Sequence, residues 1–162
     1  QVPEVVIAAS LSKNMGLYRE RTGLAIFVGP DSRTAEATVS QAKAAARRIY
    51  SMPPAHGALL AGRVLGDPIL RADWEAELTA MCARINGLRS EFQRRLEEAT
   101  GRDFGFIAKE KGMFSFLGLT EDQARSVRFE RGLYMLNSSR INIASLNAQN
   151  MDRVVAAVAS VL

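Results

Sequence analysis

A lysine and an arginine stand close together in one polar segment that follows an apolar run. Lys13 comes shortly after residues 4–9, and Arg21 lies further along the same segment. A lysine amine that is partly desolvated beside other cations is a nucleophile towards carbonyl groups. Ser10, Ser12 and Arg21 are residue types that hydrogen-bond to a phosphate monoester. The segment therefore indicates a site for a phosphorylated aldehyde, and the alternative is that Lys13 is an ordinary solvated surface cation.

The elements around this segment predict an α/β arrangement. Residues 4–9 are largely β-branched and almost wholly apolar, which predicts a strand buried on both faces, as in a parallel sheet. A second strand is predicted over residues 24–28, and helices are predicted over 34–49 and 57–65. Ligands of α/β sheets bind at the carboxyl ends of the strands, which is where Lys13 is expected to lie.

One long helix is predicted over residues 67–101. Apolar side chains recur at steps of three or four residues from Leu70 to Leu96, so that they share one face of a helix. Asp67 is suited to cap its start, and Gly101 is suited to end it. A helix of this length is expected to bridge two domains or to pack along one, and a coiled coil is the alternative.

The residues after this helix have the pattern of a small α+β domain, residues 102–162. A capping box of Thr120 and Gln123 predicts the start of a helix. A last helix is predicted over residues 150–162. Strands are predicted over 103–109, 112–117, 133–136 and 141–144.

Composition limits the class of protein. The 162 residues are 48% hydrophobic and 23% charged, which excludes disorder and collagen and suits one compact domain or two small ones. The net charge of +4 suits an anionic ligand, but the charges are interspersed, so no nucleic-acid partner is expected. A single cysteine, Cys82, and a single histidine, His56, exclude a Cys/His zinc site of the usual kind, and no metal is expected.

Location is predicted from what the sequence lacks. It has no apolar run of membrane-spanning length, and its first residues do not resemble a secretory leader. The lone cysteine cannot form an intrachain disulfide, which favours a reducing compartment. We therefore expect a cytoplasmic protein with no membrane partner.

Four segments carry a resemblance to a known family. They are residues 10–23 (SLSKNMGLYRERTG), 46–57 (ARRIYSMPPAHG), 112–119 (GMFSFLGL) and 139–144 (SRINIA). In their order and spacing they resemble motifs of class I, fold-type I pyridoxal-phosphate aminotransferases, specifically the aspartate/aromatic aminotransferase family. Three positions depart from the family's usual residues, namely Met52, Ser139 and Ser145.

The resemblance implies that this chain corresponds to the C-terminal portion of that fold. Residues 1–66 would be the end of the large cofactor-binding domain with its α/β sheet, residues 67–101 the connecting helix, and residues 102–162 the small α+β domain. The complete protein would be a homodimer, and the fragment alone is expected to be inactive.

The resemblance also implies roles for the residues of the first segment. Lys13 would carry pyridoxal 5'-phosphate as a Schiff base and would move the proton between the amino acid and the cofactor during transamination. Arg21 and Ser10 would hold the cofactor phosphate. The alternative for Arg21 and Ser10 is loop solvation and capping.

Further residues would bind the amino acid and 2-oxo acid substrates. Arg140 would hold the substrate α-carboxylate, and Phe114 would line the pocket. Arg47 would cross the dimer interface to hold a distal carboxylate, with Ser51 close by. The alternatives are a surface ion pair for Arg140 and a solvated helix end for Arg47. The preference between aspartate and aromatic amino acids is left open.

Two other classes of function stay open on the residues alone. The helical stripe is also compatible with a non-catalytic binding or oligomerisation module, in which Lys13 has no role. Lys43, Arg47 and Arg48 are also compatible with an anion or nucleic-acid binder, whose binding would depend steeply on salt.

Overall fold

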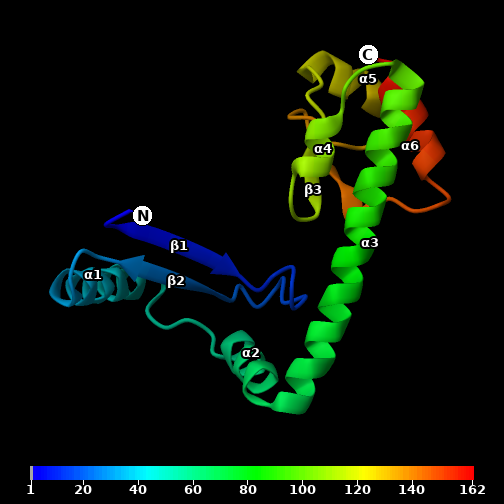
Figure 1. Ribbon diagram of the computed structural model, residues 1–162. Helices are drawn as coiled ribbons and strands as arrows, with labels where there is room; N and C mark the ends of the chain where they lie inside the picture. The colour runs from blue at the N-terminus through cyan, green and yellow to red at the C-terminus, as the bar shows by residue number, and fades with distance from the viewer. Residues whose placement is uncertain (1) are drawn as a thin grey trace. The chain divides into compact units, whose positions relative to one another are not determined.

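The computed structural model describes residues 2–162, which form two compact units (Figure 1). The first unit extends to Leu78, and the second is Thr79–Leu162. The helix α3 (Pro68–Thr100) contributes residues to both units. None of the helices in the described part of the chain combines the length and the apolar character needed to cross a membrane.

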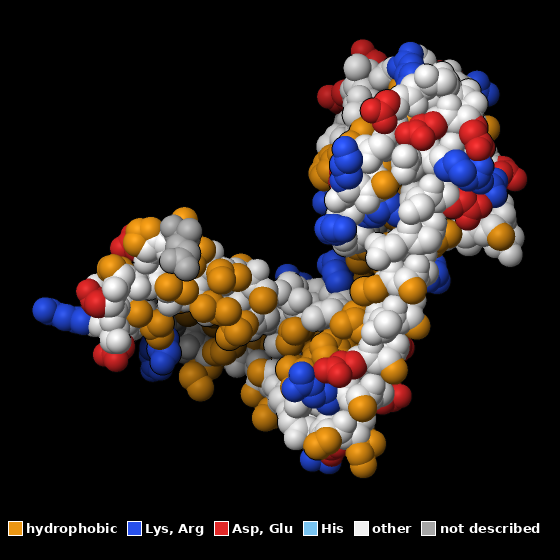
Figure 2. Space-filling model, viewed as in Figure 1, with side chains coloured by type: hydrophobic (Ala, Val, Ile, Leu, Met, Phe, Trp, Pro, Cys, Tyr) orange, Lys and Arg blue, Asp and Glu red, His pale blue; other side chains and the backbone are white. Residues whose placement is uncertain are grey.

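The first unit contains a two-stranded antiparallel sheet. Strand β1 (Val5–Ser10) pairs with β2 (Gly23–Val28), from Val5 opposite Val28 to Ser10 opposite Gly23. The strands are confirmed, but the parallel sheet and the burial on both faces are wrong for this structure. Val6 and Leu24 are 67% and 61% exposed, and many apolar side chains lie on the face of this unit seen in Figure 2.

The predicted parallel sheet fails because an apolar run determines only the extended conformation of the backbone. A continuous β-branched run favours extended backbone, but it does not choose the partner strand or its direction. Among residues 2–162, β1 pairs with β2 alone, and the two strands run antiparallel because the loop of residues 11–22 folds back without a crossover helix. The sheet faces are therefore left largely exposed in the described chain.

Two helices follow in the first unit. Helix α1 (Ser32–Tyr50) contacts β2, and α2 (His56–Gly66) precedes α3. Asp31 caps α1, because its Oδ1 accepts a hydrogen bond of 2.7 Å from the backbone N–H of Thr34. Asp67 caps α3 by accepting from the N–H groups of Ile69 and Leu70 at 3.0 and 3.3 Å, as the sequence predicts.

The Asp31 cap makes the start of α1 sensitive to acid. The backbone N–H of Thr34 favours the ionised carboxylate and lowers the pKa of Asp31 below its ordinary value of 3.8. The stabilisation is therefore present above the ordinary value and is lost as the pH falls through the lowered pKa. We expect the Thr34 amide resonance to titrate in this range, and Asp31→Asn to remove the titration while α1 persists. An unchanged titration in Asp31→Asn would contradict this assignment.

The second unit has a well-formed core between α3 and the elements that follow it. Helix α5 (Glu121–Arg131), α6 (Met151–Ala159) and the short α4 (Gly105–Lys109) surround a small antiparallel sheet of β3 (Phe114–Phe116) and β4 (Arg140–Asn142), which runs into the 3-10 helix η1 (Ile143–Ser145). Figure 1 shows α6 beside the C-terminal half of α3. Fully buried core side chains are Phe92, Leu96, Ile107, Val127, Ile143 and Val158.

The predicted helices of this unit are confirmed, and two predicted strands are wrong. Thr120 and Gln123 form the predicted capping box at the start of α5. Residues 103–109 contain helix α4 instead of a strand, since Asp103 accepts a hydrogen bond from the Gly105 N–H and starts a turn. Residues 133–136 contain no strand. Both segments are short and apolar, and periodicity does not separate helix, strand and loop at that length.

Candidate functional site

The loop that carries Lys13 is closed at its base by the hairpin. It spans residues 11–22 between β1 and β2, and the backbone N–H of Leu11 donates to the carbonyl of Thr22 at 3.1 Å. Within the loop, Lys13 Nζ lies 4.8 Å from the ring centroid of Tyr18. Arg21 Nη1 donates to the carbonyl oxygen of Tyr18 at 3.0 Å. Both cations therefore contact Tyr18, a contact that the sequence does not predict.

Ser10 shapes the start of this loop. Its Oγ accepts a hydrogen bond from the backbone N–H of Ser12 at 3.2 Å and donates to Ser12 Oγ at 3.0 Å. Ser12 is buried, whereas Ser10, Lys13 and Arg21 are exposed. The amine, the guanidinium and the hydroxyl of these three residues are therefore open to solvent at and after the end of β1.

Helix α2 supports the backbone on both sides of Arg21. His56 Nδ1 lies 3.0 Å from Glu20 Oε2. The buried Gly57 packs so closely that a Cβ there would lie 2.0 Å from Thr22 Oγ1. Arg21 itself has φ of 50°, an uncommon region for a residue other than glycine. Packing against α2 therefore accompanies a strained backbone at Arg21.

Helix α3 supports the residue that follows Lys13. The indole Nε1 of Trp74 donates to the carbonyl of Asn14 at 2.8 Å, across a long separation in sequence. Trp74 is half-buried and also lies on the apolar stripe of α3. The stripe predicts packing but not this hydrogen bond.

Arg47 and Ser51 lie together at the end of α1. Both are exposed, and the Ser51 N–H donates to the carbonyl of Arg47 at 3.0 Å. Ser51 has φ of 62° and ends the helix. The Arg47 guanidinium is therefore available at a helix C-terminus.

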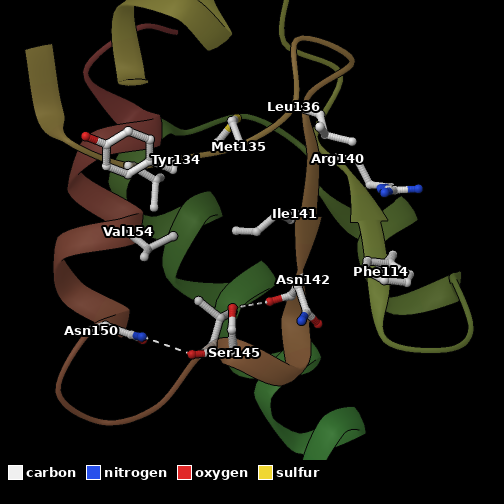
Figure 3. A pocket seen from close by; sticks show the side chains of 12 residues that line it. Phe114, Tyr134, Met135, Leu136, Arg140, Ile141, Asn142, Ser145, Asn150 and Val154 are labelled. Atoms are coloured by element: carbon white, nitrogen blue, oxygen red, sulfur yellow. Dashed lines mark hydrogen bonds between the residues drawn. The ribbon is translucent and has the colours of Figure 1, made fainter. Parts of the chain in front are cut away.

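Arg140 and Phe114 meet in the second unit. They belong to the paired strands β4 and β3, and Arg140 Cζ lies 4.8 Å above the centroid of the Phe114 ring. The two side chains lie on one side of β4, and that of Ile141 lies on the other (Figure 3). Ser139, directly before Arg140, is buried and has φ of 61°, a conformation that favours glycine. The guanidinium is thus fixed against an aromatic face.

A hollow of about 440 Å³ adjoins this pair. Its apolar lining includes Leu133, Met135, Ile141, Leu146 and Val154, and its polar lining includes Asn142, Ser145 and Asn150. Asn150 Nδ2 donates to the Ser145 carbonyl at 3.0 Å, and Ser145 Oγ donates to the Asn142 carbonyl at 2.6 Å (Figure 3). These bonds hold the turn after β4 that forms the rim.

The structure thus gathers the predicted residues into three sets. The first set is Ser10 at the end of β1 with Lys13 and Arg21 in the loop that follows it. Arg47 and Ser51 share the end of α1, and Arg140 and Phe114 share the β3–β4 sheet. An amine can condense with an aldehyde, while guanidinium and hydroxyl groups can hold phosphate. A guanidinium over an aromatic ring can hold a carboxylate in a fixed direction.

Known structures share the fold of this chain. An aromatic amino acid aminotransferase solved with 3-indolebutyric acid superposes with a TM-score of 0.89 at 44% identity, over 99% of this chain and 41% of that one. An aromatic-amino-acid aminotransferase from Burkholderia pseudomallei, described as covalently bound to pyridoxal phosphate, superposes with a TM-score of 0.86 at 41% identity, over 98% of this chain and 40% of that one.

Sequence comparisons agree with these structures. The aspartate aminotransferase of Escherichia coli is 46% identical over 160 residues, which are 98% of this chain and 40% of that protein. The aromatic-amino-acid aminotransferase of Paracoccus denitrificans is 44% identical over 162 residues, which are 99% of this chain and 41% of that protein. This chain therefore spans about 40% of the length of these relatives. Because the model of the family "aminotransferase class I and II" matches residues 1–158, this chain belongs to that family.

Proposed function

We propose that the complete protein is an aminotransferase that moves an amino group from aspartate or an aromatic amino acid to a 2-oxo acid, with pyridoxal 5'-phosphate as cofactor. The observation that carries the proposal is the joint contact of Lys13 and Arg21 with Tyr18 in one exposed loop of a chain from this family. The relative from Burkholderia pseudomallei, described as covalently bound to pyridoxal phosphate, supports the choice of cofactor.

The donor set of the loop fits this cofactor. A phosphorylated aldehyde needs an amine for its carbonyl group and hydrogen-bond donors for its phosphate, and Lys13, Arg21 and Ser10 supply these groups from exposed positions. When bound, pyridoxal phosphate supplies an electron sink that makes the Cα proton of an amino acid acidic. Lys13 would hold the cofactor covalently, and Arg21 and Ser10 would bind its phosphate.

The remaining residues act on protons and carboxylates. Once the substrate amino group has replaced it on the cofactor, the released amine of Lys13 would take the proton from the substrate Cα and deliver it to the carbonyl carbon of the cofactor. Arg140, fixed by Phe114, would hold the α-carboxylate through two parallel hydrogen bonds. Arg47, with Ser51 beside it, would hold the distal carboxylate of aspartate, and the exposed helix end on which they lie is compatible with a site shared across a homodimer.

We also propose a cellular compartment, an oligomeric state and domain boundaries for the complete protein. The protein would be cytoplasmic. It would form a homodimer, in which Arg47 would bind the substrate held by the neighbouring subunit. The first 66 residues would belong to the large domain, residues 67–101 would connect it to the small domain, and residues 102–162 would form the small domain.

The test locates the amine that takes up the cofactor. The complete protein is incubated with pyridoxal phosphate, reduced with borohydride and digested, and the modified peptide is identified by mass spectrometry. We expect the label on Lys13 and not on the other lysines, Lys43, Lys109 and Lys111. Amino-group transfer from aspartate or phenylalanine to 2-oxoglutarate is measured on the same preparation. A label spread evenly over the lysines, with no transfer, would contradict the proposal.

Two further measurements sharpen this test. The 162-residue chain alone is expected to show no turnover, so activity in a preparation of intact mass 17.7 kDa would contradict that expectation. Trp74 is the only tryptophan in the sequence, and its indole is bonded to the residue after Lys13. Its fluorescence should therefore change when the cofactor occupies the loop of the complete protein, and Trp74→Phe should remove that change.

A further inference from the structure

Arg89 is a charged side chain in the core of the second unit. It lies on α3 between the apolar residues Leu88 and Phe92, and it is only 2% exposed. Burying a guanidinium is costly unless it is paired and hydrogen-bonded. A core built for stability alone could use an apolar side chain at this position, so the contacts of Arg89 need a separate explanation.

The guanidinium of Arg89 binds the segment that leads into β3. Nη1 donates to the carbonyl of Ile107 at 3.0 Å, and Nη2 donates to the carbonyls of Gly112 and Phe114 at 2.6 and 3.0 Å. These three acceptors lie in α4, in the turn after it and in β3. One planar group therefore fixes the path of residues 107–114 against α3.

Glu110 extends this network along β3. Its Oε2 accepts from Arg89 Nη1 at 3.3 Å and also from the hydroxyl of Ser115. Its Oε1 lies 3.5 Å from the backbone nitrogen of Phe116. Arg89 and Glu110 together contact three consecutive residues of β3.

Arg140 lies on β4, which pairs with β3, so the fixed backbone of β3 also affects the position of Arg140. Phe116 lies opposite Arg140 in the sheet, and Ser115 lies opposite Ile141. The β3 carbonyl that Arg89 binds belongs to Phe114, whose ring lies under the Arg140 guanidinium. Backbone position in β3 thus decides where the Phe114 ring stands.

We propose that Arg89 is a positioning residue for Arg140, acting through Phe114 and β3. The inference deepens the function proposed above, since it concerns the guanidinium assigned there to the substrate carboxylate. Arg89 itself touches no substrate. Its planar fork reaches several carbonyls at once, which the single ammonium of a lysine cannot reproduce.

The test observes the Arg140–Phe114 contact directly. The aromatic ring shifts the Nε–Hε proton resonance of Arg140 in the 162-residue chain, and Phe114→Leu gives the value without the ring. We expect Arg89→Lys to move this resonance to the Phe114→Leu value and to remove hydrogen-exchange protection from β3 and β4. The control is Arg94→Lys on the same helix, where the arginine is exposed and pairs with Glu98, and it should leave both readouts unchanged.

The comparison separates positioning from stability. A merely structural Arg89 would lower the melting temperature but leave the Arg140 resonance of the folded chain in place, and that result would overturn the proposal. If Arg89→Lys does not fold, Glu110→Gln is used, because it weakens the same network from a partly exposed residue. It should shift the resonance part of the way, and an unshifted resonance would overturn the proposal.

A separate titration keeps the two proposals distinguishable. Succinate is titrated into the complete protein and into its Arg140→Ala variant. Equal affinities would contradict the carboxylate role of Arg140 in the proposed function. That outcome would leave the resonance comparison, and with it the link between Arg89 and Arg140, intact.

Discussion

Replacing Lys13 with alanine in the complete protein is expected to lower the turnover number for amino-group transfer about 10³-fold. The variant keeps the backbone of the loop but loses the amine assigned to the proton at the substrate Cα. The supports of the loop, from Trp74 to Asn14 and from His56 to Glu20, do not involve the Lys13 side chain. The folded structure should therefore persist, and the loss should be one of chemistry.

The measurement is the steady-state rate with saturating aspartate or phenylalanine. Lys43→Ala is the matched control, because Lys43 is an exposed lysine on α1, and its rate should equal that of the native protein. The borohydride-fixed label should also disappear from the variant peptide. A turnover number of the Lys13→Ala variant within tenfold of the native value would contradict the role assigned to Lys13.

Replacing Phe92 with alanine is expected to lower the free energy of unfolding of the second unit by about 3–5 kcal/mol. The Phe92 side chain is fully buried in the cluster that joins α3 to α6 and η1, so truncation removes contacts and leaves a cavity. Typical domains are stable by about 5–15 kcal/mol, so this loss is a large share of the total.

Urea unfolding of the 162-residue chain, followed by the helical circular dichroism signal, measures the effect. Phe129→Ala is the control, since Phe129 is on α5 in the same unit but is 74% exposed, and it should change stability by less than about 0.5 kcal/mol. Equal effects of the two substitutions would show that the core does not lie where the structure has it.

Local signals predicted the helices well. The bounds of α1, α2 and α3 agree with the predictions to within two residues, and α5 starts where its capping box predicts, because capping residues and apolar spacing act within a few residues of each other. Asp67 and the Thr120–Gln123 capping box are particular cases in which the predicted cap is the observed one. The segments 103–109 and 133–136 lacked such signals, and the strands predicted there do not form.

For the candidate site, the sequence predicted which residues belong to it but not the contacts that they make. The identity of Lys13, Arg21, Ser10, Arg47, Ser51, Phe114 and Arg140 as candidates came from residue types and from the resemblance to aminotransferases. The contact of Lys13 with Tyr18 and the support of Asn14 by Trp74 were not predictable, since each depends on how a loop folds back or on a partner far along the chain.

The sequence by itself determined the family, the helices other than α4 and the residues that carry the proposed chemistry, because motifs and helix signals are local properties of the chain. The tertiary structure alone decided that β1 pairs antiparallel with β2, and that Arg89 is buried. An arginine on a helix is ordinarily solvated, and burial is tolerated here because carbonyls from α4, the turn after it and β3 converge on its guanidinium. Such convergence is set by packing between distant segments, which no local pattern encodes.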